Sequence, residues 1–166
     1  MATDDRPNVL QIYHVNINCS DFDRALAFYE LLGFRQIVDL NAMEGKALPS
    51  LGELGLGPVL DLPADCAGRA ALLALGGDPR ATRLDLIEWT TPKSPPATPR
   101  DLSHLGIARL CLKVRDAQAL YETLSAHGYK TYSPPTLVEL AGTREYVFCC
   151  EDPDGTVIEF MQFRGA

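Results

Sequence analysis

Polar side chains capable of binding or catalysis alternate along two short segments of the chain. The two sets are His14, Asn16 and Asn18, and Arg109, Cys111 and Lys113. Residues two positions apart point to the same face of a β-strand, so each set is expected to share one face. Within a chain of net charge −7, a face that carries arginine and lysine favours an anionic or carbonyl-bearing small molecule.

Three of these residues also have a simpler interpretation. Asn18 and Lys113 stand at strand ends, where a polar side chain commonly faces solvent. Cys111 is expected to fill space rather than to act as a nucleophile, because the sequence places no histidine beside it.

The two segments are equivalent parts of an internal repeat with an offset of 95 residues. The matched pairs are His14 and Arg109, Asp21 and Asp116, Leu26 and Tyr121, Gly33 and Gly128, and Phe34 and Tyr129. In each copy a strand pattern leads to a residue suited to cap a helix, which is Ser20 or Asp21 in the first copy and Asp116 in the second. An amphipathic helix follows, and then a glycine that suits its C-terminal end. A single inserted residue would break this register, so the match is not a coincidence of composition.

Three further strand-like segments follow each glycine. They are expected at residues 34–40, 69–75 and 82–89 in the first copy, and at 130–132, 145–150 and 156–163 in the second. Each copy therefore reads β-α-β-β-β. We predict an α+β fold with two tandem βαβββ modules, residues 8–92 and 100–164, joined by a proline-rich linker at 93–99. Together they would form one pseudo-symmetric open barrel, or cup, in a single domain over 1–166.

The first copy carries an insertion at residues 41–66. The interval from Gly33 to Asp85 is 21 residues longer than that from Gly128 to Glu159. The leucines of the insertion make it too apolar for a free linker, so we expect them to pack over the pocket or against a partner subunit. We expect this segment to form a rim or lid over the cup, with a dimer contact or structural padding as the alternatives.

Three motifs of the chain resemble the vicinal oxygen chelate superfamily. They are the strand and cap at 14–21, the helix end and glycine at 28–34, and the segment from Glu151 through Asp-Pro-Asp-Gly to Phe160. That superfamily includes glyoxalase I, methylmalonyl-CoA epimerase, extradiol dioxygenases, fosfomycin-resistance enzymes and bleomycin-binding proteins. The resemblance covers essentially the whole chain, and it implies the fold strongly but the reaction only weakly.

The resemblance also implies a metal site formed by the first and last strands of each module. Carried over to this sequence, the ligand positions are His14, Asp85 and Glu159, and the fourth position, usually histidine, is Arg109. An arginine has no lone pair to donate, so the four-ligand site of the family is broken here. One histidine and two carboxylates could still hold a divalent ion such as Fe, Mn, Ni, Zn or Co. Glu88, close to Asp85 on the same strand, is expected at the rim and facing solvent.

Two states of the site remain open. In one, a metal ion is bound by His14, Asp85 and Glu159. In the other, Arg109 pairs with Glu159 or Asp85, and His14 is a polar residue of the cavity. His104, five residues before Arg109, is a further candidate for a substitute nitrogen.

Two classes of function follow. The first is an enzyme of the glyoxalase type, a lyase, isomerase or dioxygenase, with Glu159, His14 and Arg109 as catalytic residues. Its substrate would contact the residues Asn16, Asn18, Cys111 and Lys113. The alternative is a metal-free protein that binds or sequesters a small molecule, as bleomycin-resistance proteins do.

The composition excludes several classes of binding partner. With 22 acidic against 15 basic residues, the chain is not expected to bind nucleic acid or an anionic membrane. No apolar run reaches the length of a membrane-spanning helix, and the first residues lack the order of a signal peptide, so we expect a cytoplasmic protein. Five cysteines with no CxxC pair argue against a disulfide framework. A small-molecule ligand is the expected partner, and a homodimer is left open.

Overall fold

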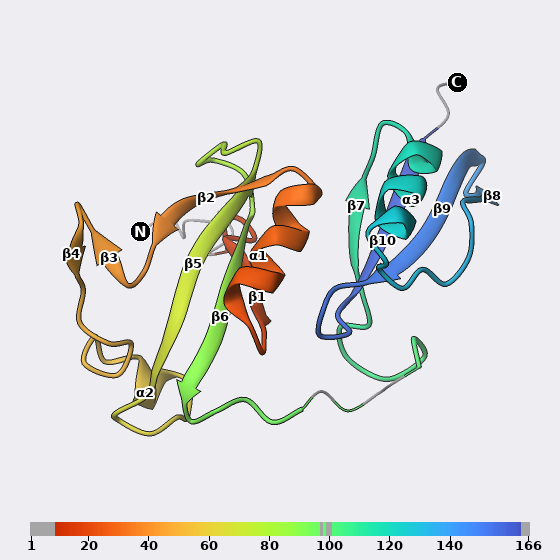
Figure 1. The fold of residues 1–166 in the computed structure, drawn as a ribbon. Helices are drawn as coiled ribbons and strands as arrows, with labels where there is room; N and C mark the ends of the chain where they lie inside the picture. Colours follow the sequence, from red (N-terminus) through yellow and green to blue (C-terminus); the bar gives the residue numbers. More distant parts are fainter. Residues whose placement is uncertain (1–8, 97, 99–100, 164–166) are drawn as a thin grey trace, which may run out of the picture. The chain divides into compact units, whose positions relative to one another are not determined.

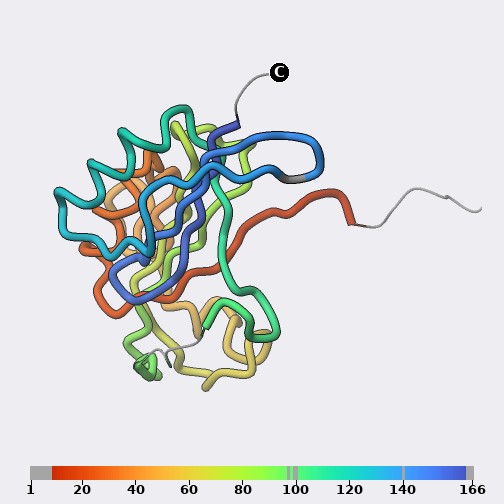
Figure 2. Tube along the Cα trace, turned by 90° about the vertical axis from the view of Figure 1, so that its right-hand side faces the viewer, coloured from red at the N-terminus to blue at the C-terminus, as the bar shows by residue number. Residues whose placement is uncertain are grey.

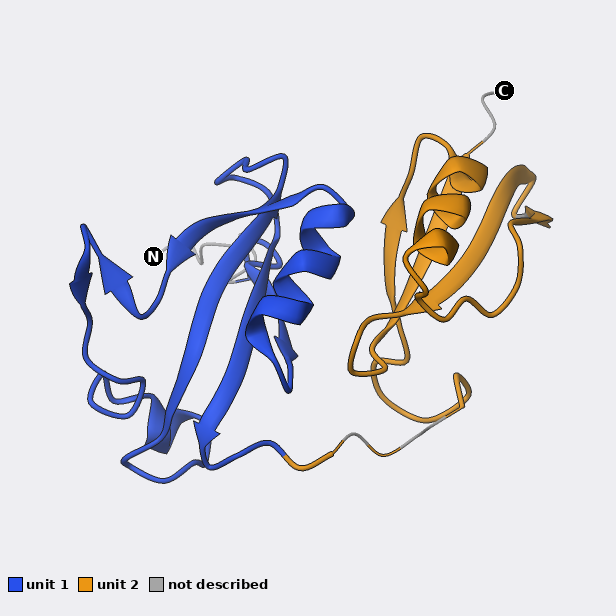
Figure 3. Ribbon diagram, in the orientation of Figure 1, with its two compact units in different colours: residues 1–94 blue, residues 95–166 orange. Residues whose placement is uncertain are grey.

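The computed structural model describes residues 9–96, 98 and 101–163. The chain divides into two compact units, residues 1–94 and 95–166 (Figure 3). This division falls inside the segment predicted as the linker. Residues 8, 97, 99, 100 and 164, at or near the predicted module and linker boundaries, lie outside the described residues.

The first unit is one four-stranded sheet with a helix on one face (Figure 1). Its elements are β1 (His14–Asn18), α1 (Phe22–Leu31), β2 (Phe34–Asp39), β3 (Ala42–Met43), β4 (Lys46–Ala47), α2 (Leu56–Val59), β5 (Ala67–Leu75) and β6 (Arg83–Thr91). The strand order in the sheet is β1-β6-β5-β2, with β1 parallel to β6 and the other pairs antiparallel.

The second unit repeats this arrangement. Its elements are β7 (Leu110–Lys113), α3 (Ala117–Ala126), β8 (Thr136–Leu140), β9 (Thr143–Glu151) and β10 (Val157–Phe163). The strand order β7-β10-β9-β8 matches that of the first sheet, and β7 is parallel to β10. The prediction of an α+β fold with two β-α-β-β-β modules is confirmed. The closure of the two sheets into one cup stays a prediction.

Both long helices begin and end as the repeat predicts. Asp21 accepts a hydrogen bond from the Arg24 N–H at 3.0 Å, and Asp116 accepts one from the Ala119 N–H at 3.0 Å, so each aspartate caps its helix. After the helices, Gly33 has φ of 95° and Gly128 has φ of 79°. This left-handed conformation costs a glycine little, and it turns the chain back toward the sheet.

The edge of the second sheet differs from the prediction. The strand expected at 130–132 is reduced to one bridge between Thr131 and Cys150, and β8 is the strand that pairs with β9. Pro134 and Pro135 stand between these two pieces. Proline has no backbone N–H for a ladder, and it therefore interrupts the edge strand.

Each sheet has a face covered by its helix and an opposite face. In the first unit, Arg69 places its guanidinium 4.2 Å from the centre of the Phe22 ring of α1, so the residues that share the face of Arg69 point to the helix. In the second unit, Gln162 of β10 accepts a hydrogen bond from the first residue of α3. We call the opposite face of each sheet its site face.

Strand alternation and register assign the remaining residues to the site faces. On the first sheet these residues include His14, Asn16 and Asn18 of β1, Arg83, Asp85, Ile87 and Trp89 of β6, and Ala70 and Leu72 of β5. On the second sheet they are Cys111 and Lys113 of β7, Glu159 and Met161 of β10, and Glu145, Val147 and Cys149 of β9. Val15 and Ile17 lie under α1, as the period-two pattern of the first strand predicts.

The cores lie between helix and sheet. Phe22, Ala25, Phe28 and Tyr29 of α1 are buried, as are Phe148 and Phe160 of the second sheet, whose rings stack at 4.9 Å between their centroids. Each such large apolar side chain contributes about 1.5–3 kcal/mol when buried. Each unit thus has its own core behind its site face. None of the described helices combines the length and apolar character that crossing a membrane requires.

Candidate functional site

His14 and Asp85 lie side by side on the site face of the first sheet. The parallel pairing of β1 and β6 puts Asn16 in register with Asp85, and His14 Nε2 is 3.9 Å from Asp85 Oδ2. Asn16 Nδ2 donates to the main-chain oxygen of Asp85 at 3.1 Å, which ties the two strands together. Two of the three predicted metal ligands are therefore neighbours within one unit.

Asp85 has an unusual environment for a carboxylate. Its side chain is 14% exposed, and its Oδ1 is buried with no hydrogen-bond partner among the described residues. Burial raises the pKa of Asp85, while the charge of His14 and the hydrogen bond of Asn16 act in the opposite direction. A carboxylate held in this way is available to a ligand that donates a hydrogen bond or brings positive charge.

Asn18 is held by the only tryptophan of the chain. Trp89 Nε1 donates to Asn18 Oδ1 at 3.0 Å, between the end of β6 and the end of β1. The simpler expectation for Asn18 was a polar side chain that faces solvent at the end of a strand. That expectation did not include the hydrogen bond from Trp89. The signal that could have found it is the alternation Asp85, Ile87 and Trp89 along one strand.

Arg109 and Glu159 form an ion pair in the second unit. Arg109 stands directly before β7, and its Nε lies 2.9 Å from Glu159 Oε1 on β10. The arginine side chain is 42% exposed and that of the glutamate 16%. Of the pairings considered for Arg109, the one with Glu159 is present. The guanidinium has further N–H donors on its two Nη atoms.

Two thiols flank Glu159 on neighbouring strands. Cys111 of β7 and Cys149 of β9 are both in register with Glu159. Burial, followed by the hydrogen bond to Glu159, raises the pKa of Cys111 to about 11, and Arg109 only partly offsets this. Burial also raises the pKa of Cys149. Both residues are therefore neutral thiols at neutral pH, and a neutral thiol is a poor nucleophile.

The far end of the second site face holds Lys113 and a buried carboxylate. Lys113 Nζ is 5.1 Å from the centre of the Phe163 ring, and Phe163 is in register with Glu145. Glu145 is 1% exposed and accepts a hydrogen bond from the Thr143 hydroxyl, while its Oε2 has no partner in the described part of the chain. Glu145 was not among the predicted site residues, although its spacing of four residues from Cys149 along β9 places it on this face.

Glu88 does not face solvent at the rim, and that expectation is wrong. It lies on the helix face of the first sheet, where its Oε2 accepts a hydrogen bond from the Phe22 N–H at 3.0 Å. Its role is to hold the start of α1.

The residues present do not fit the four-ligand metal site that the resemblance implies. In the second unit, the carboxylate of Glu159 is already paired with a permanent cation, which repels a divalent ion. His104 Nδ1 lies 2.6 Å from the Asp101 oxygen within its own loop. Among the described residues, no group of three or more His, Cys, Asp or Glu side chains is arranged to hold a metal ion. The ligand set of His14, Asp85 and Glu159 stays a prediction.

Solved structures of related fold support the architecture. A glyoxalase family protein from Bacillus cereus is similar over 97% of this chain and 99% of its own, with a TM-score of 0.76 and 20% identity. The trypanothione-dependent glyoxalase I of Leishmania major gives a TM-score of 0.59 at 19% identity, over 93% of this chain and 87% of its own. TnmS3, an antibiotic-binding protein from a Streptomyces species, gives 0.60 at 20% identity, over 96% of this chain and 100% of its own.

The sequence itself matches one family over most of its length. A comparison with curated proteins finds no match. The profile of the Glyoxalase/Bleomycin resistance protein/Dioxygenase superfamily, in contrast, matches residues 11–160. This range includes the first site face, the insertion and all but the last residues of the second repeat, and the chain therefore belongs to that superfamily.

Proposed function

We propose that this protein binds a small anionic or carbonyl-bearing molecule at its site faces, and that Arg109 holds the oxygen atoms of that molecule. The observation that supports this most is the ion pair of Arg109 with Glu159, which uses Nε and orients the guanidinium. A guanidinium fixed on its Nε side still presents its Nη groups to a carboxylate or carbonyl.

Arg109 would supply the positive charge that a metal ion supplies in relatives that chelate their substrate. It brings a fixed positive charge to polarise a carbonyl or stabilise an oxyanion, without a change of protonation. Glu159 serves as its positioning residue. The neutral thiols of Cys111 and Cys149 beside Glu159 add no competing negative charge.

The position of His14 favours an enzyme, which converts its ligand, over a protein that only sequesters it. Its imidazole stands 3.9 Å from a buried carboxylate, a pairing that suits proton transfer. The neighbours in fold include both kinds of protein, a glyoxalase I and an antibiotic-binding protein. We propose an enzyme of the lyase, isomerase or dioxygenase classes, with metal-free sequestration as the alternative.

Binding is tested with three defined probes: pyruvate, oxalate and inorganic phosphate. Isothermal titration calorimetry compares the wild type with Arg109→Gln, Arg109→Lys and Glu159→Gln. A hydrogen bond to a charged group is worth about 1.5–3 kcal/mol, so Arg109→Gln should weaken binding by at least about tenfold. Arg109→Lys should restore it only in part, because lysine lacks the planar fork.

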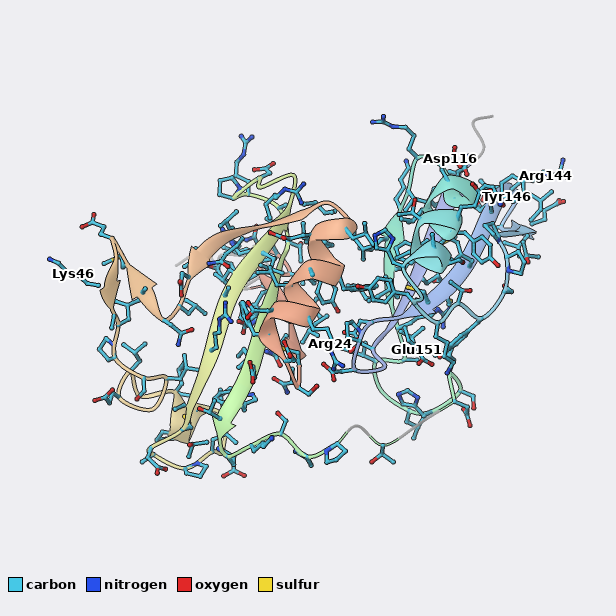
Figure 4. The ribbon with its side chains drawn as sticks, viewed as in Figure 1. Arg24, Lys46, Asp116, Arg144, Tyr146 and Glu151 are labelled. Atoms are coloured by element: carbon cyan, nitrogen blue, oxygen red, sulfur yellow. The ribbon has the colours of Figure 1, made fainter. Side chains whose placement is uncertain are left out.

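The matched control is Arg24→Gln, which removes the same charge from α1, the helix on the face of the first sheet opposite to its site face (Figure 4). It should bind the probes like the wild type. Equal affinities of Arg109→Gln and the wild type for all three probes would overturn the proposal.

Turnover is tested by deuterium exchange at the methyl group of pyruvate in heavy water, followed by proton NMR. Enzyme-dependent exchange that His14→Gln abolishes, with the affinity for pyruvate unchanged, would support proton transfer at His14. Binding without exchange in the wild type would favour the sequestering protein.

A further inference from the structure

The insertion at 41–66 covers part of the site face of the first sheet. Leu51 and Cys66, which are 3% and 0% exposed, pack against Ala70 of β5 and Ile87 of β6. The partly buried residues around this cluster are Leu40, Leu56, Leu62 and Trp89. Ala70 and Ile87 are in register with each other and lie on the same face as Asp85. The apolar side chains of the insertion therefore occupy the surface that continues from His14 and Asp85.

The covered region lies at one end of the sheet. In Figures 1 and 2 the part of the segment around α2 lies where β5 begins and β6 ends, whereas the β3–β4 hairpin lies away from that end in Figure 1. Along β6 the site face runs from Asp85, beside His14 and Asn16, to Ile87 and then to Trp89. The insertion thus divides this face into a polar end and an apolar end that the chain itself fills.

Hydrogen bonds fix the start of the insertion to the sheet. Asn41 Nδ2 donates to the Gly68 oxygen at 2.7 Å, and Asn41 Oδ1 accepts from the Ala70 N–H at 2.7 Å. One side chain thereby pairs with β5 as the backbone of a neighbouring strand would. The backbone adds a third bond, from Leu40 N to the Ala70 oxygen at 3.0 Å.

Close backbone packing fixes the remainder. Gly52 N donates to the Cys66 oxygen at 2.7 Å, which joins the two arms of the segment. A Cβ on Gly52 would clash with the Ala64 oxygen, and one on Gly57 would lie 2.6 Å from the Pro63 oxygen. Only glycine allows this approach, and a segment built in this way is a rigid part of the fold rather than a hinged flap.

We infer that the segment 41–66 is a fixed end wall, with Leu51 and Trp89 as residues that determine how long a ligand the first site face accepts. Trp89 forms the edge of the wall beside β1, because its indole Nε1 donates a hydrogen bond to Asn18 Oδ1 at 3.0 Å. This inference rests on the proposed function in one respect, that a ligand occupies the site face. It differs from a lid because nothing in the segment needs to open.

The first test uses Trp89, the only tryptophan in the chain, as a reporter of the wall. Quenching of its fluorescence by acrylamide is measured in the wild type, in Leu51→Ala and in the milder Leu51→Val. A fixed wall predicts slow quenching in the wild type and faster quenching in Leu51→Ala, with Leu51→Val between them. Leu124→Ala, a truncation of a fully buried leucine of α3, is the matched control and should leave the quenching unchanged. Fast quenching in the wild type, unchanged by Leu51→Ala, would overturn the inference.

The second test measures ligand length with straight-chain carboxylates from acetate to decanoate as the probes. Each buried methylene should strengthen binding by about fourfold until the chain reaches the wall, and affinity should then stop rising. Leu51→Ala should move this limit to longer chains, whereas Leu124→Ala should not. If Leu51→Ala does not fold, Leu62→Ala serves the same purpose at the border of the cluster.

The two proposals fail in different ways. Carboxylates that bind with no dependence on Arg109 would contradict the proposed function, while the quenching of Trp89 would still test the wall. A length limit that is the same in the wild type, Leu51→Ala and Leu62→Ala would contradict the wall, whatever the result for the Arg109 variants.

Discussion

Glu88 of β6 accepts a hydrogen bond from the backbone N–H of Phe22, the first residue of α1, at 3.0 Å. The second module has the same device, because Gln162 Oε1 of β10 accepts from the Ala117 N–H, the first residue of α3, at 2.8 Å. Each helix N-terminus is thus held by the last strand of its own module, in addition to its capping aspartate.

These two hydrogen bonds identify equivalent positions on the last strands of the two modules. Glu88 follows Asp85 by three residues, and Gln162 follows Glu159 by three residues. Because both contacts meet the first residue of the equivalent helix, Asp85 and Glu159 are equivalent positions within their units. That equivalence follows from the hydrogen bonds and does not depend on any relative.

The first prediction concerns these contacts. Glu88→Ala should lower the free energy of unfolding by about 1 kcal/mol, because the N–H of Phe22 loses its partner. Gln162→Ala should have a similar effect through Ala117. Urea unfolding followed by circular dichroism gives both values. Glu88→Gln is the matched control, because in the second module a glutamine, Gln162, accepts the equivalent hydrogen bond. A Glu88→Gln variant as unstable as Glu88→Ala would show that charge, and not the hydrogen bond, is what matters.

The second prediction concerns the reactivity of Cys111. Glu159 raises the pKa of this thiol, through a hydrogen bond and its charge, while Arg109 lowers it. Glu159→Gln should therefore lower the pKa and speed alkylation by iodoacetamide at mildly alkaline pH. Arg109→Gln should act in the opposite direction and slow it.

Peptide mapping by mass spectrometry resolves the rate at Cys111 from those at the other cysteines, of which Cys19, Cys66 and Cys150 are buried. Equal alkylation rates at Cys111 in the wild type and both variants would contradict the electrostatic coupling between these three side chains.

The third prediction concerns Asp85 and pH. Burial raises the pKa of this carboxyl in the folded state, so the folded protein holds the proton more tightly than the unfolded chain. The resulting stability is present in acid, below the usual value of 3.8, and is lost as the pH rises through the folded-state pKa. Asp85→Asn does not titrate, and it should be more stable than the wild type at neutral pH but not in acid.

Thermal unfolding at several pH values measures this difference. Asp65→Asn, at an exposed position, makes the same change of charge and should show no such pH dependence. A stability gain of Asp85→Asn that is the same in acid and at neutral pH would show that the carboxyl charge is not its cause.

The fourth prediction concerns metal binding. Arg109→His removes the cation beside Glu159 and supplies a nitrogen at the position where the superfamily has one. Titration with Fe(II), Mn(II), Ni(II), Zn(II) and Co(II) should show weak binding by the wild type and tighter binding by Arg109→His. Arg109→Gln removes the charge without adding a strong ligand, and it should fall between them. Tight stoichiometric binding by the wild type would show that His14, Asp85 and Glu159 suffice.

Much of each module could be predicted from the sequence, because the signals are local. The helix starts near Ser20 or Asp21 and at Asp116, and the glycines after the helices, follow from residue type and spacing alone, and the hydrogen bond to the Arg24 N–H then identifies Asp21 as the first cap. Strand alternation also predicts that His14 and Asn16 share a face opposite Val15 and Ile17. These features depend on backbone geometry within a few residues, and that geometry repeats at a fixed offset.

Features that depend on distant contacts were not predictable in the same way. Glu88 looks like any polar residue near a strand end, and only the packing of α1 on the sheet shows its partner. Asn41 gives no sign in the sequence that its amide pairs with β5, 27 and 29 residues away. The strand predicted at 130–132 is a single bridge in the structure, because Pro134 and Pro135 interrupt the edge strand just after it.

Those two prolines have a consequence for how the protein behaves at high concentration. The free edge of a sheet invites the strand of another molecule, and such edge-to-edge pairing starts aggregation. At the β8 edge of the second sheet, the stretch between Thr131 and Thr136 contains two successive residues without an N–H. An incoming strand could therefore not extend a continuous ladder from β8 across this stretch, which disfavours edge-to-edge pairing here.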